Sequence, residues 1–180
     1  MKTQRILVPL DFSDCSRFLV AEASTLAARL GASLTLLHVV TPPEGLSADT
    51  PIRPEADGTT TTIGRYLVDA AWERLPAFVQ VAQAAQVRAE PMVLIGPIAD
   101  TIVEQAEAGD HGMVVMGTHG RRGIARMLMG SVAEQVTRRS PVPVLTVRTE
   151  HRPDCEARSC QWCASHVMPQ DVEVGVELEG

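Results

Sequence analysis

Two groups of residues in this chain have the types and spacing that bind ligands. The first is a glycine-rich stretch, Met116-Gly117-Thr118-His119-Gly120, followed after nine intervening residues by Gly130-Ser131. Glycine carries no Cβ and can adopt positive φ, so its amide can approach an anion closely. Gly130-Ser131 precedes a helical pattern, and a helix N-terminus offers N–H groups without partners inside the helix. The stretch therefore predicts a phosphate-binding loop, although Ser131 could equally act only as a helix cap.

The second group lies near the end of the chain, in the pattern H-x3-C-x4-C-x2-C-x2-H. The gap between Cys160 and Cys163 lets two sulfurs reach one ion, and zinc takes four such ligands tetrahedrally. We expect zinc bound by four side chains, with His151 as an alternative ligand: Cys155, Cys160, Cys163 and His166. An iron–sulfur cluster would use the same thiolates, and a tail whose cysteines are incidental or redox-active is the third interpretation.

Length and charge narrow the class of protein. A chain of 180 residues that is 45% hydrophobic is long enough for one domain with a full core, plus a tail. The net charge of -6 argues against a general nucleic-acid binder, which needs clustered cations. No apolar run reaches the roughly 18 to 20 residues of a membrane span. We therefore expect a cytoplasmic protein that neither spans a membrane nor binds nucleic acid.

Short apolar runs alternate with longer helical patterns along the chain. They predict strands over 5–8, 33–40, 88–94, 113–116 and 142–148, and helices over 15–30, 62–86, 98–108 and 131–139. Pro76 should kink the second helix or end it and start another, because proline cannot donate an intrahelical hydrogen bond. The proline- and threonine-rich segment 41–61 is expected to be a mobile loop.

This alternation predicts an α/β fold: a single doubly wound domain, with a parallel sheet and helices on both faces. Ligands of such sheets bind at the carboxyl ends of the strands, where the strand order reverses. Asp11, just past the first predicted strand, and the Gly117 loop both fall there.

Four ordered segments resemble the universal stress protein family, in its ATP-binding branch. The Gly117-x2-Gly120-x9-Gly130-Ser131 spacing is similar to the family's nucleotide signature, and three further segments resemble its first, second and last strands: Arg5–Ser13, Leu36–Val40 and Ser140–Val147. The resemblance covers residues 1–149 and leaves 150–180 as a Cys/His-containing C-terminal extension. It implies a five-stranded sheet in the order 3-2-1-4-5, and a homodimer formed through the last core strand, Val142 to Val147.

The resemblance also implies which residues hold the nucleotide. Asp11 would contact the nucleoside, with Pro9 beside it, and the main chain of Val39 would meet the adenine edge. The ribose and the phosphates would lie against the glycine loop and the segment after it: Met116, Gly117, Gly120, Gly130, Ser131 and Val132. From the sequence alone, Asp11 is equally suited to capping the first helix near Ser13 or Asp14.

The expected function is that of a dimeric, ATP-binding regulatory protein of the stress response, which takes ATP alone or with Mg²⁺. The sequence shows no Ser-His-Asp arrangement, paired carboxylates or Walker lysine, so we expect at most slow ATP hydrolysis. One alternative is an ATP-hydrolysing enzyme of the related adenine-nucleotide hydrolase group. The other is a metal- or redox-responsive module that acts through the C-terminal extension.

Overall fold

The computed structural model describes residues 5–13, 15–54, 59–118 and 130–148. In chain order, the elements are β1 (Arg5–Leu10), α1 (Ser16–Leu30), β2 (Ser33–Val40), β3 (Pro51–Ile52), β4 (Thr61–Thr62), α2 (Ile63–Arg74), α3 (Pro76–Ala84), β5 (Ala89–Ile95), α4 (Ile98–Ala108), β6 (Met113–Gly117), α5 (Ser131–Arg139) and β7 (Val144–Val147).

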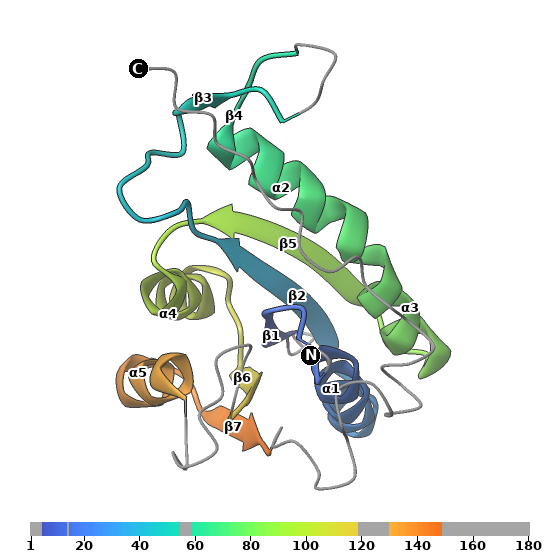
Figure 1. Ribbon diagram of the computed structural model, residues 1–180. Coiled ribbons are helices and arrows are strands. Elements are labelled where there is room, and N and C mark those ends of the chain that lie inside the picture. The colour runs from blue at the N-terminus through green and yellow to red at the C-terminus, as the bar shows by residue number, and fades with distance from the viewer. Residues whose placement is uncertain (1–4, 14, 55–58, 119–129, 149–180) are drawn as a thin grey trace, which may run out of the picture.

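Five of the strands form one parallel sheet in the order β5-β2-β1-β6-β7. The expected order 3-2-1-4-5 is thereby confirmed, since β3 and β4 form a separate two-stranded sheet. Figure 1 shows α1, α2 and α3 on one side of the large sheet, and α4 and α5 on the other. The doubly wound architecture predicted from the alternating pattern is therefore the observed one.

The central strands are apolar on both faces because both faces are covered by helices. In β1, Ile6 and Val8 pack with α1, α2 and α3, whereas Leu7 between them packs with α4 and α5. All three side chains are buried. Continuous apolar runs, rather than alternating ones, are what a doubly covered strand requires.

Segment 41–61 differs from the expected mobile loop. Pro51 pairs with Thr62 and Ile52 with Thr61 in the antiparallel β3–β4 hairpin. Just beyond the hairpin, the amide of Ile63 donates to the carbonyl of Thr50 at 3.0 Å, and that of Gly64 donates to Ala48 at 2.8 Å. The first amides of α2 need acceptors outside the helix, and this segment supplies them. The loop prediction was wrong because composition does not reveal this backbone pairing.

The ends of α1 and the break between α2 and α3 lie close to the positions predicted from the sequence. Pro76 separates α2 from α3, as predicted. Gly31 ends α1 with a φ of 62°, and its amide donates to the carbonyl of Ala27. The helix begins at Ser16, while Cys15 lies half-buried at the capping position. In the part of the chain that the structure describes, no helix is both long enough and apolar enough to cross a bilayer.

Candidate functional site

The sheet divides between β1 and β6 at its carboxyl end. β1 pairs with β2 from Arg5 to Leu10, but with β6 only at Ile6 and Leu7. Alternate residues of a strand direct their backbone groups to the same neighbour, and the Arg5 carbonyl accepts from the amide of Gly112, just before β6, at 2.8 Å. Pro9 therefore also faces β6, where it has no N–H to donate. We infer that Pro9 ends the ladder at the point where the strand order reverses.

Asp11 lies directly after β1, at this division. Its Oδ1 accepts from the amide of Ser13 at 2.9 Å and from the hydroxyl of Ser16 at 3.1 Å. The capping position of α1 itself is Cys15, which makes no side-chain cap. The carboxylate of Asp11 thus organises the turn into α1, as the capping interpretation expects. A carboxylate has two oxygens and can accept more than two hydrogen bonds.

The end of β6 lies on the other side of the division. Gly117 pairs with Val147 in β7, and the amide of Thr118 donates to the carbonyl of Val147 at 2.9 Å. The carbonyl of Thr118 in turn accepts from the amide of Gly130 at 2.7 Å. Residues 118 and 130 are therefore hydrogen-bonded, and the segment between them starts and ends at one place. Gly120 belongs to that segment and lies outside the described residues.

Gly130 is the capping residue of α5, with φ −68° and ψ 153°, and it makes no side-chain cap. Ser131 is the first helical residue and is exposed, so the alternative in which Ser131 caps the helix is wrong. A helix that begins without a side-chain cap directs partial positive charge outward from its first turn. α5 therefore presents amides beside Thr118, at the carboxyl edge of the sheet.

The expected use of positive φ is not seen at Gly117, which lies in a strand. Among the described glycines, only Gly31 and Gly45 have positive φ. What Gly117 and Gly130 share at this edge is the absence of a Cβ, and a glycine backbone can be approached more closely than that of any other residue.

Val39 and Met116 are buried in the cluster that packs under α4 and α5, and the half-buried Val132 packs against the same cluster. Because their side chains are committed to the core, Val39 and Met116 can offer a ligand mainly their backbone. The expectation that Val39 contacts adenine through its main chain stays a prediction.

The structure thus brings most of the expected residues to one edge of the sheet, from three elements. Pro9 and Asp11 come from β1 and the turn after it, Met116 and Gly117 from β6, and the start of α5 completes the edge. Sequence reasoning missed Thr118, the buried residue that joins β7 to Gly130. Its place between two loop glycines was the only available signal.

The expected metal ligands lie outside the described residues: His151, Cys155, Cys160, Cys163 and His166. Within the ranges that the structure describes, no three His, Cys, Asp or Glu side chains are grouped closely enough to hold a metal ion.

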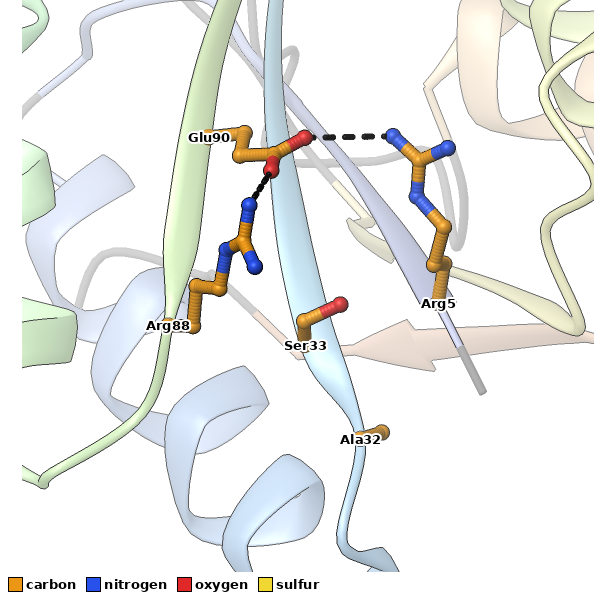
Figure 2. A pocket seen from close by; sticks show the side chains of 5 residues that line it. All are labelled: Arg5, Ala32, Ser33, Arg88 and Glu90. Carbon is orange, nitrogen blue, oxygen red and sulfur yellow. Dashed lines mark hydrogen bonds and ion pairs between the residues drawn. The ribbon is translucent and has the colours of Figure 1, made fainter. Parts of the chain in front are cut away.

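A separate hollow of about 350 Å³ lies at the opposite, amino end of the sheet. Figure 2 shows Arg5 and Arg88 on either side of Glu90 there, and the carboxylate pairs with both guanidinium groups, at 3.4 Å and 2.5 Å respectively. Glu90 partly neutralises the two cations that an anionic ligand would need. The carboxyl end of the sheet therefore remains the better candidate site.

Comparison with known proteins agrees with this architecture. The Universal stress protein family matches residues 2–148. A universal stress protein of Methanocaldococcus jannaschii is 33% identical over 147 residues, which cover 81% of this chain and 82% of that protein. A universal stress protein solved in complex with cAMP is 27% identical, with a TM-score of 0.60 over 82% of this chain and 98% of that one.

A second universal stress protein of M. jannaschii shares the fold, with a TM-score of 0.69 at 23% identity over 84% of this chain and 100% of that one. The match to the family, over residues 2–148, covers the whole five-stranded sheet and the helices on both of its faces. The chain belongs to the universal stress protein family.

Proposed function

We propose that this chain is a regulatory stress-response protein of the cytoplasm that binds ATP at the carboxyl ends of β1 and β6. The observation that carries the proposal is the convergence of Asp11, Gly117 and the start of α5 where the β1–β6 ladder stops. A relative that is 27% identical was solved in complex with cAMP, an adenine nucleotide, which supports this ligand class.

Each part of the edge suits one part of the nucleotide. The phosphates would lie against Gly117 and the first amides of α5, because unpartnered N–H groups and the helix dipole favour anions. The carboxylate of Asp11 would accept from a nucleoside donor, and the backbone of Val39 would meet the adenine edge. Gly120, Ser131 and Val132 would complete the phosphate contacts, as the family resemblance implies.

Titration calorimetry with ATP, ADP, AMP and cAMP, each with and without Mg²⁺, tests this proposal. We expect ATP to bind with one site per chain. Absence of binding by all four nucleotides would overturn the proposal. If ATP is also turned over, and the turnover disappears in Asp11→Ala, the hydrolase alternative would replace a purely regulatory role.

We further propose that the protein is a homodimer in which β7 pairs with β7 of a second copy. The amide of Val114 donates to Pro143 and that of Thr118 donates to Val147, so odd-numbered residues of β7 face β6. Val144 and Thr146 consequently direct their backbone groups to the side of β7 away from β6, the edge at which no strand pairs within the described residues. Leu145, on this edge strand, is 43% exposed. An open apolar edge of this kind is usually paired or covered.

A further inference from the structure

Phe12, the residue directly after Asp11, has an unusual backbone conformation. Its φ is +59°, in the left-handed region that side chains larger than glycine rarely adopt. Gln86 and Asp110 also have positive φ, but both are exposed and follow the ends of helices. Phe12 is bulky and only 6% exposed. Such a residue keeps a strained conformation only where its surroundings hold it there.

The surroundings of Phe12 hold both its ring and its backbone. The ring stacks on His38, with centroids 4.0 Å apart, and on Phe78, at 5.4 Å. The Cζ of Arg74, in α2, lies 4.5 Å from the centroid of the Phe12 ring, within cation–π range. A guanidinium N–H of Arg74 also donates to the Phe12 carbonyl at 3.4 Å.

His38 ties this group back to β1. Its Nδ1 lies 2.7 Å from the carbonyl of Leu10, the last residue of the strand. Because a carbonyl only accepts, Nδ1 carries the proton and donates. Leu10 and Phe12, on either side of Asp11, are therefore both bound by residues from other elements.

The torsion at Phe12 determines where Ser13 lies relative to Asp11. The carboxylate of Asp11 accepts from the amide of Ser13, across Phe12, and from the hydroxyl of Ser16. A glycine would adopt the same φ with less strain, but it would have no ring for His38 or Arg74 to hold. The phenylalanine therefore adds anchoring to a turn that glycine could make more easily.

We propose that Phe12, held by His38, Phe78 and Arg74, is a positioning residue that fixes the Asp11 carboxylate in the orientation that receives the nucleotide. This inference rests on the proposed function, since it names what prepares that same site. Phe12 acts through Asp11 and need not touch the nucleotide itself.

A double-mutant cycle on ATP affinity tests the proposal. A hydrogen bond to a charged group is worth about one to two decades of affinity, so misplacing the carboxylate in Phe12→Ala should weaken ATP binding about tenfold or more. In an Asp11→Ala background, Phe12→Ala should then have almost no further effect. An equal loss in both backgrounds would mean that Phe12 does not act through Asp11.

Two further variants keep the test valid if Phe12→Ala folds poorly. Arg74→Met removes the guanidinium contacts to the ring and carbonyl of Phe12, but keeps an apolar stem, and should weaken ATP binding in the same direction. Arg65→Met is the matched control on the same helix, because Arg65 is exposed and its guanidinium group pairs with Asp69 of the same helix at 3.1 Å. Loss of affinity in Arg65→Met equal to that in Arg74→Met would overturn the assignment.

Hydrogen exchange at the Ser13 amide separates this proposal from the proposed function. This amide is held by the carboxylate of Asp11, so it should exchange at least about tenfold faster in Phe12→Ala and in Arg74→Met than in wild type or Arg65→Met. The measurement needs no nucleotide. Unchanged exchange in both variants would overturn the positioning role even if ATP binds. Faster exchange in a protein that binds no nucleotide would retain the positioning role and reject the proposed ligand.

Discussion

Acid should destabilise this protein through His111, a buried histidine in a directional chain of hydrogen bonds. Nδ1 of His111 lies 3.0 Å from the carbonyl of Gln105, and Nε2 lies 3.0 Å from the hydroxyl of Thr35. Because the carbonyl only accepts, Nδ1 carries the proton, and Nε2 accepts from Thr35. The hydroxyl oxygen of Thr35 in turn accepts from Arg5 at 3.4 Å. Protonation of Nε2 would leave the hydroxyl proton of Thr35 without its acceptor and place a cation near Arg5.

The pKa of His111 is lowered below its usual 6.5, mainly because burial disfavours the charged ring. The hydrogen bond to the Gln105 carbonyl opposes this shift, the positive charge of Arg5 adds to it, and the negative charge of Asp110 opposes it. As the pH falls through 6.5, His111 therefore becomes protonated in the unfolded chain while it stays neutral in the folded chain. The stability from neutral His111 is complete above pH 6.5 and falls as the pH drops below 6.5 toward the folded pKa. Each unit by which the pKa is lowered corresponds to about 1.4 kcal/mol of unfolding free energy.

His111→Asn isolates this effect in urea denaturation between pH 8 and pH 5. Asparagine can still donate toward Gln105 but is too short to accept from Thr35. The variant should be less stable than wild type by about 1 to 3 kcal/mol at pH 8, the cost of a buried hydroxyl without its acceptor. The gap should narrow as the pH falls below 6.5, since only wild type has the titrating ring and all other groups are shared. A gap that stays constant or widens with acid would refute the reasoning.

Three further outcomes are expected. Gly117→Val and Gly130→Val should each abolish ATP binding in calorimetry, because a branched side chain would occupy the space in which backbone approaches phosphate; unchanged affinity in both would move the site elsewhere. Thr146→Pro removes an amide from the free edge of β7 and should give monomers in light scattering, whereas Thr146→Val should remain a dimer; a wild type that is monomeric at micromolar concentration contradicts this. The pair Cys160→Ser and Cys163→Ser should lose a stoichiometric zinc in native mass spectrometry while ATP binding persists; wild type purified without chelator and free of metal would leave the extension without a metal role.

The sequence predicted the sheet well because its signals are local and repeated. The apolar runs that predict the strands are each only a few residues long, and Gly31 and Pro76 affect only the helix beside them. The strand–helix alternation and the helix break could therefore be predicted directly from the sequence. The structure of segment 41–61 could not be predicted in this way, because backbone atoms make the contacts between Ala48 and Gly64 and between Thr50 and Ile63, and these contacts depend little on residue type.

The sequence could predict where the candidate site lies, because its place follows from topology: Asp11 directly follows one parallel strand and Gly117 ends another. The roles of Pro9 and Phe12 emerge only in three dimensions. Pro9 ends the ladder because of the direction in which its missing amide would point, and the torsion of Phe12 is fixed by residues as distant in sequence as Arg74.

The two ends of the sheet differ in construction, so we expect stability and ATP binding to respond differently to acid. At the amino end, the partly exposed Arg5 donates to the buried Thr35, which in turn donates to the buried His111. At the carboxyl end, the β1–β6 ladder stops after Leu7, and the start of α5 lies beside the end of β6. Acid should therefore lower the folded fraction through His111 without altering the groups proposed to hold ATP. At each pH, the ATP affinity is corrected for the fraction of protein that is folded. This corrected affinity should change less with pH than the free energy of unfolding does. A parallel loss of both would show that the two ends of the sheet are coupled.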